Sequence, residues 1–160
     1  MKKFKFCLTN IGLTKTRLAQ FCVGALITIT ITVLPGASRA DVAVIVHPDN
    51  PIGSITETYI SRIFLGKTES FPDKGKATPI EHKEGSSLKK AFHTGVTRKN
   101  PNQLNAYWSR LIFTGKGTPP KVVRNDKKVK SLVSSNTDYI GYIDSANVDG
   151  SIKVVFTVAN

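Results

Sequence analysis

The sequence predicts an α/β fold, in which a mostly parallel sheet flanked by helices forms a single three-layer unit. Two observations support this prediction. Short runs of β-branched residues alternate along the chain with segments whose apolar residues recur at helical spacing. Residues 41–160 comprise 120 residues, enough to bury one hydrophobic core, so they are most simply one domain.

Residues 1–40 have the three parts of a secretory signal peptide. Lysines open the chain, an uncharged apolar run of 14 residues follows from Phe21 to Leu34, and Ser38 and Ala40 are the small residues before a cut at Asp41. The alternative is a transmembrane anchor, but a span needs roughly twenty apolar residues. We therefore expect 1–40 to be a cleaved signal peptide and 41–160 a periplasmic domain, with no stable membrane insertion after cleavage.

Removal of that leader changes what composition implies. Cys7 and Cys22 are the only cysteines, so residues 41–160 can form no disulfide and no cysteine metal site. The formal net charge falls from +12 to +6, which fits small anions, anionic polymers or acidic partners better than nucleic acid. The three histidines show no paired metal spacing, so we expect neither a metal nor a cofactor.

The first elements follow from local signals. Asp41–Pro48 is a β-branched run that ends at a proline, as a buried strand of a mostly parallel sheet would. Ser54 and Glu57 form a capping-box pattern that predicts a helix start, and Gly66 predicts its end. Thr78–His82 is expected to be a short strand.

The second half continues the alternation. Asn100-Pro101 predicts the start of a helix whose apolar stripe would be buried. That stripe consists of Leu104, Tyr107, Trp108, Leu111 and Ile112. The other expected elements are a helix from Ser86, a loop at Thr114–Lys121, a helix at Asp126–Asn136, and strands at Asp138–Asp144 and Ser151–Val158. The basic segment Lys116–Lys130 is either a solvated face or a docking face.

A candidate site follows the strand Thr78–His82. Ligands of α/β sheets bind beyond the carboxyl ends of parallel strands, and Gly85, Ser86 and Ser87 stand at that point, at the start of a helix. Free amides at a helix start, serine hydroxyls and Lys83 would together suit an oxyanion. The simpler interpretation is that one serine caps the helix and the lysines are solvated.

Three segments give the chain a resemblance to a known family. At "IFLGK" (Ile63–Lys67), "HKEGSSLKKAF" (His82–Phe92) and "IGYI" (Ile140–Ile143) it resembles the phosphate-binding proteins of ABC transporters, and more closely their short single-lobe relatives. The resemblance covers nearly all of 42–156. It implies a single lobe of a periplasmic-binding-protein-like fold.

The resemblance also implies a ligand segment. The family's R-x-D-G-S-G-T pattern aligns with residues 82–88, so that His82 stands at the arginine position, Ser86 retains the serine, and Ser87 and Leu88 replace a glycine and a threonine. The implied anion ligands are His82, Lys83, Gly85, Ser86, Ser87 and Leu88. Two minor candidates are Lys89 and His47, and His47 is included because it ends the first strand, where it would border the same edge of the sheet as His82.

Two functions from different classes remain open at this stage. The first is a periplasmic solute-binding-type protein that recognises phosphate or another small oxyanion and is linked to phosphate ABC transport. The second is an envelope protein-interaction or signalling module with weak or no anion binding. An enzyme is not expected, because residues 41–160 carry no cysteine nucleophile and no G-x-S-x-G elbow.

Overall fold

The computed structural model describes residues 41–73 and 75–158. The predicted signal peptide, with Cys7 and Cys22, lies outside the described residues. Cleavage before Asp41 therefore stays a prediction. No helix of the described part is long and apolar enough to cross a membrane.

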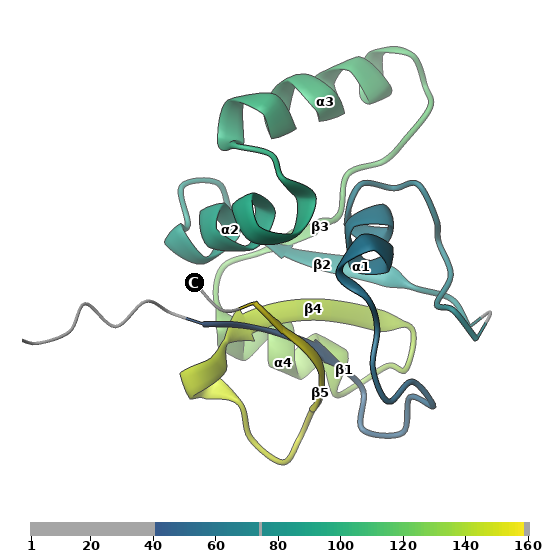
Figure 1. Ribbon diagram of the computed structural model, residues 1–160, viewed down its shortest axis with the longest axis vertical. Coiled ribbons are helices and arrows are strands. Elements are labelled where there is room, and N and C mark those ends of the chain that lie inside the picture. Colours follow the sequence, from purple (N-terminus) through teal and green to yellow (C-terminus); the bar gives the residue numbers. More distant parts are fainter. Residues whose placement is uncertain (1–40, 74, 159–160) are drawn as a thin grey trace, which may run out of the picture. The chain divides into compact units, whose positions relative to one another are not determined.

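Five strands form one sheet in the order β3-β2-β4-β1-β5 (Figure 1). Their bounds are Val42–Val46 (β1), Thr78–His82 (β2), Lys121–Val123 (β3), Tyr139–Asp144 (β4) and Lys153–Val158 (β5). β2 runs parallel to β3 and β4, whereas β1 is antiparallel to both of its neighbours, β4 and β5. Four strands therefore share one direction, as predicted, but β1 lies between β4 and β5, so two of the four strand pairings are antiparallel.

Helices cover both faces of this sheet. The helices of the described part are α1 (Glu57–Phe64), α2 (Ser87–Phe92) with its π-helical continuation η1 (His93–Thr97), α3 (Pro101–Phe113) and α4 (Asp126–Val133), followed by the short 3-10 turn η2 (Ser145–Asn147). Of these, α3 covers neither face and packs instead against Leu65, which follows α1. Apolar side chains of α1, α2 and η1 pack with one face of β1, β4 and β5. Those of α4 pack with the other face, where they meet β2, β3 and β4. The result is the three-layer α/β arrangement that the sequence predicts.

The start of α1 differs from the prediction. Its N-cap is Thr56, whose side chain accepts a hydrogen bond from the amide of Tyr59, so Ser54 and Glu57 do not form the expected capping box. A threonine two residues later in the chain offers the same kind of hydroxyl to the first free amides. The predicted end is confirmed, because Gly66 follows the C-cap with a φ of +65°.

α3 buries only part of its predicted stripe. Leu104 and Trp108 are buried against Leu65 in a small separate cluster. Ile112 and Phe113, at the end of the helix, are 54% and 93% exposed. The start is as predicted, with Asn100 and Gln103 forming a capping box and proline at the first position.

The strand β3 lies in a segment for which a loop is the expectation. Lys121–Val123 pairs in parallel with Ile80–His82, although only Val123 of the three is buried. A strand of three residues has too little alternation to be recognised locally. The following helix α4 ends at Val133, three residues before the predicted end at Asn136.

Candidate oxyanion site

The candidate site begins with a tight turn at the carboxyl end of β2. The amide of Ser86 donates to the carbonyl of Lys83 at 3.3 Å, which closes a four-residue turn. Gly85, the third residue of this turn, has a φ of +78°, a value that side chains other than glycine rarely adopt. No atom lies within 4 Å of the position where a Cβ of Gly85 would stand. Backbone conformation, not crowding, is therefore the reason for a glycine here.

Ser86 is the N-cap of α2. Its side chain accepts a hydrogen bond from the amide of Lys89 at 3.4 Å, which is the simpler of the two roles that the sequence allows. The amides of Ser87 and Leu88, the first two of the helix, have no partner among the described residues. The hydroxyl of Ser87 is also without a partner there, and the residue is exposed. The turn thus offers two amides and one hydroxyl to an acceptor.

The charges around this turn divide into two sets. The Lys89 ammonium is buried, forms an ion pair with Glu81 at 3.1 Å and donates a hydrogen bond to Glu84, so its charge is already balanced. Lys83 and Lys90 are exposed, and within the described residues their side chains make no ion pair. These two lysines, not Lys89, are the cations available to an anion.

The ring of His82 is buried at the carboxyl end of β2. It is 3% exposed, and its Nε2 donates to the carbonyl of Tyr142 at 3.0 Å and lies 3.4 Å from the carboxylate of Asp126. The buried ring thus has partners within the protein, and it does not line the hollow beside Ser87 and Leu88. The β4 carbonyl is an acceptor only, so it holds the proton on Nε2.

His47 and His93 lie elsewhere. His47 follows β1, whose residue Val46 is paired with Ile140 at the start of β4. Because β1 runs antiparallel to β4, His47 and His82 lie at opposite ends of the strands. This corrects the expectation that the two border the same edge. His93 is buried, and its Nε2 bonds the carboxylate of Glu81.

The start of α4 lies beside the start of α2, at the end of the sheet where β2 and β3 finish. The sequence alone did not predict that these two helix starts lie together. A hollow of about 630 Å³ lies between them. Its lining residues are Ser87, Leu88, Asn125, Asp126, Lys127, Lys130, Asp144 and Asn147. Recognition of β3 as a parallel strand would have placed α4 here, since helices that follow neighbouring parallel strands begin at one edge.

Most polar groups of that hollow already have partners. Asp126 accepts from the amide of Asp144 at 3.0 Å and from the side chain of Asn147 at 2.7 Å. Lys130 donates to Asp149, and this hydrogen bond, with those from Ser151, lowers the pKa of Asp149 to about 2. Lys127 is exposed and makes no ion pair among the described residues, so it adds a third free cation beside Ser87.

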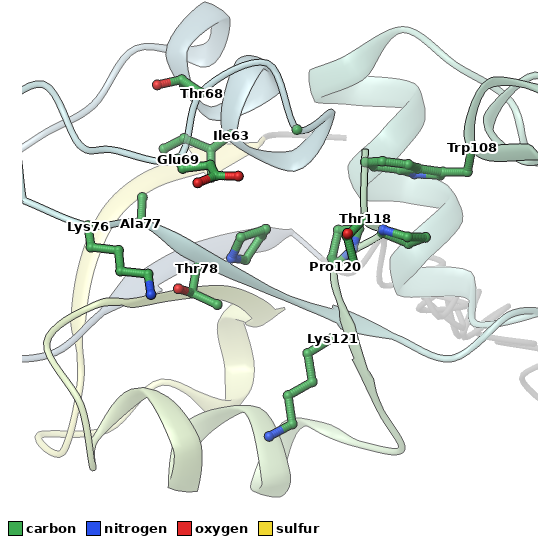
Figure 2. A pocket seen from close by; sticks show the side chains of 13 residues that line it. Ile63, Thr68, Glu69, Lys76, Ala77, Thr78, Trp108, Thr118, Pro120 and Lys121 are labelled. Carbon is green, nitrogen blue, oxygen red and sulfur yellow. The ribbon is translucent and has the colours of Figure 1, made fainter. Parts of the chain in front are cut away.

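A second hollow lies at the other end of β2 and β3. Figure 2 shows this pocket of about 300 Å³, into which Lys76, Thr78 and Trp108 project from different parts of the chain. Glu69, Pro119 and Pro120 also line it. This pocket lies at the opposite end of β2 and β3 from the candidate anion site. Thr78 and Lys121 begin these strands, whereas Ser87 and the start of α4 follow their ends.

Metal binding finds no support in this part of the chain. Among residues 41–73 and 75–158, no three side chains of His, Cys, Asp or Glu are grouped so as to hold a metal ion. The candidate site consists of amides, hydroxyls and ammonium groups, which are donors and suit an anion.

No family model matches the sequence, and no curated protein matches it. Solved structures do match. A phosphate ABC transporter substrate-binding protein from Clostridium perfringens, solved with bound phosphate, is similar with a TM-score of 0.59 and 24% identity. An ABC-type phosphate transport receptor from Vibrio cholerae gives 0.57 and 20%, and PstS from Borrelia burgdorferi gives 0.53 and 17%.

Coverage is partial in both directions. Each of these three matches covers 72% of this chain, but only 45%, 46% and 47% of the respective neighbour. The chain thus spans less than half the length of the proteins it resembles. The neighbours are binding proteins rather than enzymes. In fold, the described part of the chain therefore resembles a single lobe of these proteins.

Proposed function

We propose that this protein is an exported solute-binding-type protein that recognises phosphate or a related small oxyanion at the turn between β2 and α2. The observation that carries the proposal is the pair of unpartnered amides at Ser87 and Leu88, directly after the positive-φ residue Gly85. The fold shared with phosphate-transport proteins supports the same ligand class. A link to phosphate ABC transport is the corresponding role.

The ligand groups of the proposed site are the two amides, the Ser87 hydroxyl and the exposed ammonium groups of Lys83 and Lys127. Ser86 supports the turn through its cap, and Leu88 contributes its backbone only, since its side chain is buried. His82 takes no direct part, because its Nε2 proton is held by the Tyr142 carbonyl.

Weak affinity follows from this composition. Two or three charge-assisted hydrogen bonds at about 1.5–3 kcal/mol each give a gross gain of roughly 3–9 kcal/mol. Lost translational and rotational freedom removes about 4–15 kcal/mol. At best about −5 kcal/mol remains, which corresponds to a dissociation constant of roughly 0.2 mM. A second surface that closes over the anion would be needed for tight binding.

Calorimetric titration with phosphate tests the site, on protein refolded from denaturant to remove bound anion. We expect Ser87→Ala and Lys83→Gln each to weaken binding severalfold without loss of stability. Lys67→Gln, an exposed lysine outside the site, is the matched control. Ser86→Ala is expected to lower the unfolding free energy by about 0.5–2 kcal/mol, as loss of an N-cap does. Unchanged affinity in both Ser87→Ala and Lys83→Gln would remove the site.

Export is the second part of the proposal. Its support is the sequence pattern of residues 1–40 and the periplasmic-binding-protein-like fold. N-terminal sequencing of the protein from its native cell is expected to begin at Asp41. An intact Met1 in a membrane fraction would contradict export by a cleaved leader.

The exposed end of α3 favours the second candidate function, a protein-interaction or signalling module. Phe113 is 93% exposed and Ile112 54% exposed, next to each other on one helix end. A photo-crosslinker introduced at position 113 should then form adducts in the native cell, whereas one at the exposed residue Thr94 should not. Equal labelling at both positions would remove the support for this candidate.

A further inference from the structure

The strand β3 forms one edge of the sheet. It is the first strand in the order β3-β2-β4-β1-β5 and pairs only with β2. The carbonyl of Val123 accepts a hydrogen bond from the amide of Lys83, which follows β2. Because backbone groups of successive residues in a strand point to opposite sides, the N–H and C=O of Val122 point outward, away from β2. That edge position is therefore open to a further strand.

Four cations gather beside this edge. Lys121, Arg124, Lys127 and Lys128 line an open groove of about 560 Å³ between β3 and the first turns of α4. All four are exposed, and among the described residues none of them makes an ion pair. No carboxylate lines the groove. An uncompensated group of this kind attracts a partner of negative charge.

The two faces of β3 differ in chemistry. Val123 packs against Val129 and Val133 of α4, so Lys121, two residues earlier, lies on the same face. Val122 lies on the other face and is 55% exposed. A strand added along this edge would therefore meet cations with one set of alternate side chains and a branched apolar side chain with the other.

We propose that the β3 edge and its cationic groove bind an extended, acidic segment of a partner protein, in which acidic residues alternate with apolar ones. Its backbone would pair with the outward N–H and C=O of Val122. Its acidic side chains would face Lys121, Lys127 and Lys128, and its apolar side chains would face Val122. The positive charge of the groove favours a negatively charged segment, and the open strand edge favours one in an extended conformation.

A short, lysine-bearing edge also has a purely protective explanation. Natural sheets use such edges to prevent self-association. The two explanations differ in what a peptide does, because a protective edge repels strands, whereas a docking edge accepts one of matching pattern.

The test measures fluorescence anisotropy of a short capped peptide in which Glu alternates with Val, at low and high salt. One comparison peptide has the same composition with its Glu residues grouped at one end, and another carries N-methyl groups on the amides that would pair. We expect the alternating peptide to bind at least fivefold more tightly than either, with an affinity that falls as salt rises. Equal binding of the grouped or methylated peptide, or tighter binding of polyphosphate, would overturn the proposal in favour of general polyanion binding.

Variants of the protein sharpen the test. Val122→Pro removes an N–H that β2 does not use, so the fold is expected to survive while peptide affinity falls at least fivefold. Arg124→Gln with Lys128→Gln removes two groove charges that do not border the oxyanion hollow, and the matched control is Lys67→Gln with Lys116→Gln. Circular dichroism and melting curves verify folding. Affinity unchanged in the groove variants, or no binding of the alternating peptide at millimolar protein, would show that the edge is protective only.

Discussion

At the scale of single residues, the phenol of Tyr142 links the sheet core to the candidate site. Its ring stacks on that of Phe92, with centroids 4.0 Å apart, and its hydroxyl accepts a hydrogen bond from the amide of His82 at 3.5 Å. Burial raises the pKa of Tyr142 well above its usual value, and the nearby carboxylate of Glu81 adds to this effect. The folded protein therefore resists ionisation of this group.

This pKa shift predicts a loss of stability in alkali. Above about pH 10 the unfolded chain releases the phenolic proton while the folded protein retains it, so the unfolding free energy falls by up to about 1.4 kcal/mol per pH unit for this one group. In Tyr142→Phe this contribution is absent, and the decline between pH 9 and 11 is expected to be shallower than in the parent. Denaturant unfolding at each pH measures it, with Tyr139→Phe on the same strand as the control. Parallel declines in Tyr142→Phe and the parent would contradict the assignment.

At the scale of elements, Glu81 connects β2 with the helical segment α2–η1. One of its carboxylate oxygens lies 3.1 Å from the Lys89 ammonium, and the other bonds the His93 ring. All three side chains are buried. Glu84, the second partner of Lys89, is largely exposed, so the same lysine has one buried and one exposed carboxylate.

Glu81→Gln and Glu84→Gln form a matched pair on that lysine. Removal of the buried partner leaves the buried Lys89 ammonium with only the exposed Glu84 and removes the carboxylate that the buried His93 ring bonds, so we expect a loss of about 3–5 kcal/mol in unfolding free energy. Removal of the exposed partner is expected to cost about 0–1 kcal/mol. Chemical denaturation measures both. Similar losses in the two variants would show that Glu81 does not fasten the helix to the sheet.

The contact between β4 and α4 depends on a glycine, which has no side chain. A Cβ at Gly141 of β4 would lie 2.5 Å from Val129 Cγ1 of α4, closer than packed atoms approach. Gly141→Ala should therefore force α4 away from the sheet, at a cost of roughly 1–3 kcal/mol.

Thermal melting of Gly141→Ala, with and without Val129→Ala, checks this contact. The second substitution removes the clashing methyl, so the double variant is expected to lose less than the sum of the two single losses. Additive losses would contradict direct contact between the two positions.

At the scale of the whole molecule, stability rests on packing of the two helical layers on one sheet. Residues 41–160 contain no cysteine, and the described residues hold no metal-ligand group of three. We expect the melting temperature of the purified protein to be the same in buffer, in reductant and in chelator, as measured by far-UV circular dichroism. A lower melting temperature in chelator would reveal a metal site.

The sequence by itself determined features that depend on neighbours along the chain. The bounds of β2, Thr78–His82, agree with the prediction to the residue. Proline at the first position of α3 and positive-φ Gly66 after α1 are also as expected. Each rests on a local steric or hydrogen-bonding preference, which acts within a few residues and can be recognised without knowledge of the fold.

Tertiary structure alone decided the direction of strands and the partners of charged groups. The reversed direction of β1 placed His47 at the far edge of the sheet, because an apolar β-branched strand has the same pattern in either direction. Lys89, near the predicted anion site, turned inward because Glu81 and Glu84 lie within reach. The ring of His82 forms a hydrogen bond with the carbonyl of Tyr142, 60 residues further along the chain. Such choices depend on pairings between distant segments, and no local pattern encodes which segments will meet.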